Sequence, residues 1–200
     1  MKIIGLVGGM GSGKTSVVEL INESTNAHII NADIVGHTIL KKGNPAYYPV
    51  IEYFGSEILS KDGEIDRKVL GRIVFSDKNK LKKLNEITHP LIYQSIKEEI
   101  SIITKKNKYD YIVIDAALLI EIKLTELVDQ VWGVYAPLET RIKRVMLRDK
   151  FSKEEARKRI SSQLPWTKIQ EYIDIEIDNS DSIDYVKEQV YKLLNKTYKE

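Results

Sequence analysis

Short apolar runs alternate with longer segments of helical periodicity along this chain. The apolar runs are five or six residues long and lie at 2–7, 27–31, 111–115, 131–135 and 173–177. The run at 2–7 fits a strand buried in a parallel sheet, and the other runs are further strand candidates. Helical spacing fills most of the intervals, at 15–24, 34–75, 78–104, 138–148, 153–162 and 182–194. Strands separated by helices predict an α/β fold with a mostly parallel sheet.

Turn-forming and capping residues refine these elements. Two turns, at 43–45 and 61–63, interrupt the first long helical stretch. Pro90 lies inside the longest helical segment, and because proline lacks an amide N–H and clashes with the preceding turn, we expect it to kink or divide that helix. Ser152, with Glu155 three residues on, predicts a capping box at the start of the following helix.

Composition excludes several classes of protein. The 200 residues are 42% apolar and carry a net charge of +2, which suits one globular domain and argues against a strongly basic nucleic-acid binder. No cysteine is present, which excludes a disulfide framework, a thiolate metal site and a cysteine nucleophile. The apolar run 111–120 is too short to span a membrane and contains Asp115. Without a recognisable signal peptide, we expect a cytoplasmic protein.

Positive charge is concentrated in one window. Residues 141–159 hold nine Lys and Arg against three Asp and Glu, including five of the seven arginines of the chain. Such a window is typical either of a solvated helix face or of a site for an anionic ligand. Composition alone does not decide between the two.

Residues 8–15, Gly-Gly-Met-Gly-Ser-Gly-Lys-Thr, match the phosphate-loop pattern G-x-x-x-x-G-K-[ST] in full. The glycines let backbone N–H groups approach phosphate oxygens, and the following helix presents its positive N-terminal end to the same anion. The lysine can reach the β- and γ-phosphates, and the threonine hydroxyl can ligate Mg²⁺. We therefore expect a nucleoside triphosphate and Mg²⁺ as ligands, held by Gly8, Gly9, Gly11, Ser12, Gly13, Lys14, Thr15 and Ser16.

A second nucleotide motif is rejected. Residues 107–110 read Asn-Lys-Tyr-Asp, which resembles the guanine-reading N-K-x-D of GTPases. In GTPases this motif follows a buried strand, whereas here it precedes one, and Asp115 does not begin a D-x-x-G. A polar turn leading into the strand is the better interpretation.

Two carboxylates follow predicted strands at the edge where a parallel sheet binds ligands. Asp33 follows the strand at 27–31, where it could orient and deprotonate an attacking hydroxyl or serve as a helix N-cap. Asp115 ends the strand at 111–115. It could hold Mg²⁺, as an acid at this position does in phosphate-loop enzymes, or bond to the phosphate loop's backbone or to Thr15.

Taken in order, the motifs of this chain resemble the dephospho-coenzyme A kinase family. They are the phosphate loop, Asp33 with His37, 62–67 (Asp-Gly-Glu-Ile-Asp-Arg), 87–90 (Ile-Thr-His-Pro), 115–121 (Asp-Ala-Ala-Leu-Leu-Ile-Glu), Arg144, Arg148 with Asp149, Gln163 and 177–179 (Ile-Asp-Asn). The resemblance covers nearly the whole chain. Ala117 and Ile120 depart from the usual Pro and aromatic or Leu of the family, which affects loop packing without removing a reactive group.

The resemblance implies ATP-dependent phosphorylation of the ribose 3′-hydroxyl of dephospho-coenzyme A, the last step of coenzyme A biosynthesis. It also implies a three-layer α/β/α phosphate-loop fold with a helical acceptor-binding region and a helical lid. The division we expect is a core at 1–32, 110–137 and 172–200, an acceptor region at about 33–109 and a lid at about 138–171. We expect neither nucleic-acid nor membrane partners, and the oligomeric state stays open.

On the lid, Arg141, Arg144 and Arg148 share one face of a helix by their spacing. Arginine suits bidentate contact with phosphate, so we expect Arg144 to close on the transferring phosphoryl group, with Arg148 as its rival. The alternative is a solvated face. For Arg157 and Arg159, a solvated or salt-bridged side chain is the better interpretation.

The resemblance implies an acceptor side made by Asp33, His37, Arg67, His89 and Leu118. Three of these residues keep structural alternatives: a structural role for His37, an ion pair for Arg67 and a cap at the break before Pro90 for His89.

The resemblance places Asn179 beside the adenine of ATP, and a turn-forming role is its alternative. The rival functions are another small-molecule or nucleoside monophosphate kinase and, from a different class, a nucleotide-dependent switch.

Overall fold

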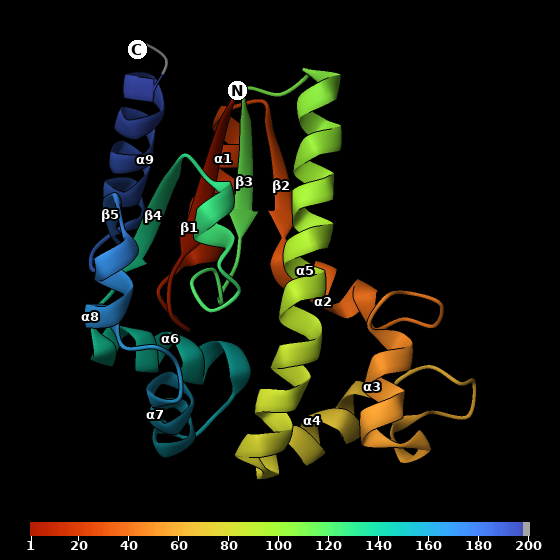
Figure 1. The fold of residues 1–200 in the computed structure, drawn as a ribbon. Coiled ribbons are helices and arrows are strands. Elements are labelled where there is room, and N and C mark those ends of the chain that lie inside the picture. The colour runs from red at the N-terminus through yellow and green to blue at the C-terminus, as the bar shows by residue number, and fades with distance from the viewer. Residues whose placement is uncertain (198–200) are drawn as a thin grey trace. The chain divides into compact units, whose positions relative to one another are not determined.

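The structure, a computed structural model, describes residues 1–197. Within them, five parallel strands form one sheet in the order β2-β3-β1-β4-β5 (Figure 1). The strands are β1 (Lys2–Val7), β2 (Ala27–Asn31), β3 (Tyr111–Asp115), β4 (Gln130–Tyr135) and β5 (Ile175–Asp178). The predicted α/β fold with a parallel sheet is confirmed. β1 lies between β3 and β4, so its carboxyl end opens at the point where the strand order reverses, which is where such sheets bind ligands.

The helices follow the predicted pattern closely. They are α1 (Lys14–Ser24), α2 (Ala32–Ile39), α3 (Tyr47–Phe54), α4 (Arg67–Ser76), α5 (Lys78–Lys106), α6 (Leu138–Asp149), α7 (Lys153–Ser161), α8 (Trp166–Ile169) and α9 (Ile183–Thr197). Short 3₁₀ turns add η1 (Ser56–Ile58), η2 (Leu124–Leu127) and η3 (Gln170–Tyr172). No helix of the described chain is long and apolar enough to cross a membrane.

One helix and one strand differ from the sequence prediction. Helix α5 continues through Pro90 without dividing, because 29 residues of helix supply enough other hydrogen bonds to tolerate one missing N–H. Strand β5 begins at Ile175 rather than at Ile173. The 3₁₀ turn η3 ends only at Tyr172, and the N–H of Ile173 still donates to the carbonyl of Gln170 at 3.3 Å. The predicted capping box is confirmed, since the Ser152 hydroxyl and the Glu155 carboxylate each bond the other's backbone N–H.

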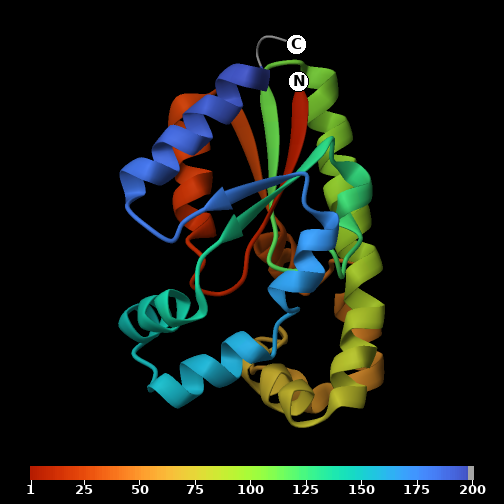
Figure 2. The same cartoon turned by 90° about the vertical axis from the view of Figure 1, so that its left-hand side faces the viewer.

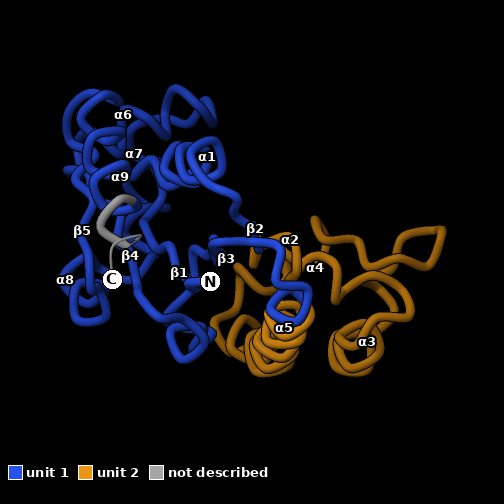
Figure 3. Tube along the Cα trace, turned by 90° about the horizontal axis from the view of Figure 1, so that it is seen from above, with its two compact units in different colours: residues 1–30, 103–200 blue, residues 31–102 orange. Residues whose placement is uncertain are grey.

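The chain divides into two compact units, coloured separately in Figure 3. Unit 1 comprises residues 1–30 and 103–200 and contains the phosphate-loop motif, and the segment predicted as a lid falls within it. Unit 2 comprises residues 31–102 and contains α2, α3, α4 and most of α5.

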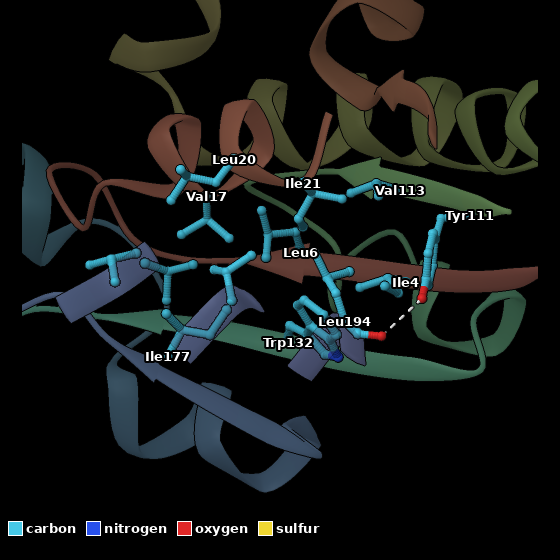
Figure 4. Packing of buried hydrophobic residues seen from close by; sticks show 13 residues of the cluster. Ile4, Leu6, Val17, Leu20, Ile21, Tyr111, Val113, Trp132, Ile177 and Leu194 are labelled. Atoms are coloured by element: carbon cyan, nitrogen blue, oxygen red, sulfur yellow. Dashed lines mark hydrogen bonds between the residues drawn. The ribbon is translucent and has the colours of Figure 1, made fainter. Parts of the chain in front are cut away.

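The core of unit 1 forms between the sheet and two helices, α1 and α9, which pack side by side on one face (Figure 2). Ile4 and Leu6 of β1 point toward Val17 and Ile21 of α1, because alternate residues of a strand face the same side (Figure 4). The buried hydroxyl of Tyr111 donates to the carbonyl of Leu194 in α9 at 3.4 Å. This packing fixes α1, and therefore the loop that precedes it, against the sheet.

A second cluster in unit 1 joins α6 to α7. Its buried residues are Ile142, Val145, Ala156 and Ile160, and Met10, Met146 and Phe151 pack against it. Met10 belongs to the phosphate-loop motif, so this cluster connects the loop to the α6–α7 pair.

Candidate active site

The phosphate-loop motif forms the turn between β1 and α1. Gly13 precedes the helix with a φ of 91°, a left-handed conformation that glycine adopts without strain. No side chain caps the start of α1, and its first turn contains no acidic residue. A helix start of this kind, without a side-chain cap or an acidic residue, suits the binding of an anion. The exposed Thr15 hydroxyl lies in this first turn, followed by Ser16, whose N–H donates to the Gly13 carbonyl at 3.1 Å.

Ser12 shapes the loop from inside. Its residue surface is 2% exposed, and its N–H donates to the Gly9 carbonyl at 2.9 Å. Within residues 1–197 its hydroxyl has no hydrogen-bond partner. A Cβ on Gly8 would approach that hydroxyl to 2.6 Å, so a bare backbone at Gly8 makes room for it.

Arg144 and Asn179 bind backbone carbonyls of the loop. Arg144 Nη1 lies 3.4 Å from the Gly11 carbonyl and 3.3 Å from the Ser12 carbonyl, and Asn179 Nδ2 donates to the same Ser12 carbonyl at 2.7 Å. The two side chains are also joined, because Arg144 Nη2 donates to both the backbone carbonyl and Oδ1 of Asn179, at 3.1 and 3.3 Å. Asn179 is 5% exposed, so these bonds are shielded from water.

Lys14 and Asp115 form an ion pair, with side chains only 16% and 13% exposed. The carboxylate at the end of β3 thus meets the phosphate-loop lysine. Within the described chain, no three His, Cys, Asp or Glu side chains gather where they could share a metal ion.

Three other arginines of the basic window contact groups outside the loop. Arg148 forms a bidentate pair with its neighbour Asp149, at 2.9 and 2.8 Å, and its side chain is 62% exposed. That pairing raises the pKa of Arg148 and lowers the pKa of Asp149. Arg157 pairs with Glu139 at 2.9 Å, and Arg159 lies 4.2 Å over the ring of Phe151.

Two further residues contact the loop, and sequence reasoning gave them no role at it. Arg141 Nε donates to the Met10 carbonyl at 2.9 Å, and the Met10 N–H donates to Gln163 Oε1 at 2.7 Å. Burial lowers the pKa of Arg141, although arginine stays protonated at physiological pH. The motif contained no signal for these contacts, because position 10 is a variable position and its backbone groups are the ones bound.

In unit 2, two residues predicted for the acceptor side, His37 and Arg67, bond to each other, and the start of α2 shows which residue caps that helix. Asn31, not Asp33, caps α2, since Asn31 Oδ1 accepts the Ile34 N–H at 3.0 Å. The capping alternative for Asp33 was therefore wrong. Asp33 is exposed and lies in the first turn of α2. His37, one turn on, is hydrogen-bonded through Nε2 to Arg67 Nη2. This bond replaces the ion pair that was the alternative for Arg67.

The protonation of His37 follows from this setting. Desolvation and the Arg67 charge lower the pKa of His37, and Asp33 opposes them. His37 is therefore neutral at pH 7, and its Nε2 accepts from Arg67, which leaves the proton on Nδ1.

Two hollows lie near the remaining predicted residues, one in each unit. His89 and Pro90 line an open hollow of about 560 Å³ on α5, together with Lys78 and Lys82. The helix is unbroken at this point, so the alternative of His89 as a cap was wrong.

In unit 1, Leu118 is 40% exposed and lines a cavity of about 20 Å³, along with Gly9, Gln163 and both departures from the family pattern, Ala117 and Ile120. Glu121 lines the same cavity, where burial raises the pKa of its carboxyl.

Comparison with known proteins identifies the family. The family model described as dephospho-CoA kinase matches residues 2–185. A dephospho-CoA kinase from Carboxydothermus hydrogenoformans is 45% identical over 98% of this chain and 94% of its own length.

Solved structures agree. A dephospho-CoA kinase structure from Campylobacter jejuni has a TM-score of 0.71 at 30% identity, covering 98% of this chain and 96% of that one. A shikimate kinase from Acinetobacter baumannii, at a TM-score of 0.54 and 14% identity, covers 99% of this chain and 93% of its own and shares the fold alone. With the matched family model and these relatives, the chain belongs to the dephospho-CoA kinase family.

Proposed function

We propose that this chain transfers the γ-phosphoryl group of ATP to the ribose 3′-hydroxyl of dephospho-coenzyme A, and that it does so in the cytoplasm. Dephospho-CoA kinase activity, the last step of coenzyme A biosynthesis, follows from its family. The observation that carries the site assignment is the phosphate loop itself, with uncapped helix amides on one side and its carbonyls held by side chains on the other.

The phosphate side of the site is made by Lys14, the loop amides and Thr15. Lys14 contacts Asp115 in this structure, and we propose that its ammonium turns from that carboxylate to the β- and γ-oxygens when nucleotide binds. The charge of Lys14 and the positive end of α1 then stabilise the negative charge that develops on the β–γ bridging oxygen.

The donor set also suits Mg²⁺. Thr15 offers an exposed hydroxyl and Asp115 a carboxylate, which are the hard oxygen ligands that this ion prefers. Two protein groups without a full protein cage fit an ion that is completed by phosphates and water. When bound, the ion supplies positive charge to the β- and γ-oxygens.

On the acceptor side, we propose Asp33 as the group that orients the 3′-hydroxyl and accepts its proton. The hydroxyl oxygen forms a bond to the γ-phosphorus while the bond from that phosphorus to the β–γ bridging oxygen breaks, and ADP leaves. His37 lies one turn after Asp33, whose charge acts on it, and is hydrogen-bonded to Arg67; we assign His37 and Arg67 to the acceptor's phosphate and ribose. His89 and Leu118 are proposed as further acceptor contacts.

Arg144 is the proposed arginine for the transferring phosphoryl group. Its guanidinium already lies at the loop, where it bonds the Gly11 and Ser12 carbonyls, whereas Arg148 is exposed and paired with Asp149. Arg144 therefore already lies beside the groups that would hold a γ-phosphate, whereas Arg148 is held by Asp149. This difference supports Arg144 over Arg148.

A panel of acceptors with labelled ATP tests the proposal. We expect dephospho-coenzyme A to gain one phosphate at the 3′ position, identified by mass and fragmentation, and nucleoside monophosphates to gain none. Phosphorylation of a nucleotide without phosphorylation of dephospho-coenzyme A would overturn the substrate. ADP release that is independent of any acceptor would instead favour a nucleotide switch.

A further inference from the structure

Both backbone groups of Met10 are bound by side chains that lie far away in the sequence. Its carbonyl accepts from Arg141 Nε at 2.9 Å, and its N–H donates to Gln163 Oε1 at 2.7 Å. Arg141 Nη2 lies 3.4 Å from the same Gln163 oxygen, which closes a small ring of three residues. Arg141 lies in the first turn of α6, and Gln163 follows the end of α7.

These bonds determine which way the neighbouring peptides face. A trans peptide is planar and holds its C=O and N–H in opposite directions. The Met10 carbonyl points toward Arg141, so the Gly11 N–H of the same peptide points in the opposite direction. In the preceding peptide, Gln163 binds the Met10 N–H, and the Gly9 carbonyl on the other side accepts from Ser12 at 2.9 Å. Arg141 and Gln163 thus orient both peptides that flank Met10.

The loop glycines are matched to this contact. A Cβ on Gly9 would lie 2.3 Å from Arg141 Nη2, and a Cβ on Gly11 would lie 2.6 Å from the Arg141 carbonyl oxygen. A side chain at Gly9 would displace the Arg141 guanidinium, and one at Gly11 would push the backbone of α6 off the loop, since the Arg141 carbonyl cannot rotate away. The absence of a side chain at Gly9 and Gly11 therefore leaves room for Arg141 to contact the loop.

The Met10 side chain ties the loop to the same helices. It packs against the apolar cluster of α6 and α7, which contains Ile142 and Ile160. One residue of the phosphate loop is therefore anchored three times, through its carbonyl, its N–H and its side chain, and all three anchors lie on the segment 138–163.

We propose that Arg141 and Gln163 are positioning residues for phosphoryl transfer: by holding the two peptides around Met10, they keep the Gly11 N–H directed at the nucleotide phosphates. The proposal rests on the phosphate loop being the ATP site of the kinase. The Arg141 bonds go to a carbonyl and an amide oxygen, which are uncharged, so its positive charge also remains available to the anion held by the loop.

The test compares steady-state kinetics of Gln163→Met and Arg141→Ala with wild type. Gln163→Met keeps the side-chain volume and removes the acceptor oxygen. We expect kcat/KM for ATP to fall by roughly tenfold in each variant, which is the effect of losing about one well-placed hydrogen bond. The KM for dephospho-coenzyme A should stay within about twofold, because the loop contacts only the donor. The double variant should lose less than the product of the two single effects, since both act on the same peptides.

Matched controls come from the same part of the chain. Gln170→Met removes an exposed glutamine whose Nε2 bonds Glu176, and Arg157→Ala removes an exposed arginine paired with Glu139. Both should keep wild-type kinetics. The inference is overturned if kcat/KM for ATP is unchanged in both test variants, if the controls lose as much, or if the two substrates' KM values rise together. A wild-type chain that does not phosphorylate dephospho-coenzyme A would instead refute the proposed function.

Discussion

Asn179→Ala probes the contact between the end of β5 and the phosphate loop. The substitution removes the 2.7 Å bond from Nδ2 to the Ser12 carbonyl and the 3.3 Å bond that Oδ1 accepts from Arg144. It leaves the backbone bonds of residue 179, including the 3.1 Å bond from Arg144 to its carbonyl. The Ser12 carbonyl then retains the 3.3 Å contact with Arg144.

The expected loss follows from these distances and from the 5% exposure of Asn179. One short buried hydrogen bond and one long one, with a carbonyl left under-satisfied, should cost about 1–3 kcal/mol of the free energy of unfolding. For a chain of this size, the melting temperature should fall by about 2–12 °C. A loosened Ser12–Gly13 peptide also orients its N–H less well, so the KM for ATP should rise.

Thermal denaturation and steady-state kinetics measure the two effects. Asn26→Ala is the matched control, because its Nδ2 also donates to a backbone carbonyl, that of Lys108, but at an exposed site. The control should melt within about 2 °C of wild type. If Asn179→Ala melts with the control and keeps the wild-type KM for ATP, the assignment of Asn179 to holding the loop is refuted.

Four further predictions test other parts of the molecule. Asp33→Asn should lower kcat by roughly 100-fold or more without changing the KM for ATP, and near-normal turnover would exclude Asp33 as the base. Arg144→Ala should lower kcat more than it raises the KM for ATP, whereas an effect on KM alone would restrict Arg144 to holding the loop. The folded-state pKa of His37 lies below its ordinary value of 6.5, so its contribution to stability is present above pH 6.5 and is lost as the pH falls through the folded-state pKa. The melting temperature of the wild type should therefore fall at acidic pH, and in His37→Asn this part of the fall should be absent. Ser152→Ala should cost about 1 kcal/mol in chemical denaturation by removing the capping box of α7, and an unchanged midpoint would contradict that role.

Much of the fold could be predicted because the relevant information is local. The central strands β1, β3 and β4 are largely apolar and buried, and such a strand can be recognised without knowing its partner. The phosphate loop was equally clear, since each residue of its pattern performs its role within eight consecutive positions. The corrections were also local in origin: Pro90 does not divide the 29-residue helix around it, and Asn31 rather than Asp33 caps α2.

The roles of the basic window depended on packing. Arg141, Arg144 and Arg148 share a helix face, and spacing alone treats them as equivalent. Because a helix rises 1.5 Å per residue, Arg148 lies about 10 Å further along α6 than Arg141 does, beyond the short loop that the first two contact. The order of contacts along the loop, Arg141 at Met10 and Arg144 at Gly11 and Ser12, follows from that rise.

The sequence alone was enough to predict the α/β class, to locate the nucleotide-binding loop and to indicate the family, because periodicity and motifs in a fixed order carry that information. Which side chains hold the loop was decided by folding. Arg141, Gln163 and Asn179 are 131, 153 and 167 residues from the loop groups they bind, and their partners are backbone atoms, which are the same at every position and leave no mark in the sequence. Only the docking of α6, the chain after α7 and the end of β5 against one turn brings them together.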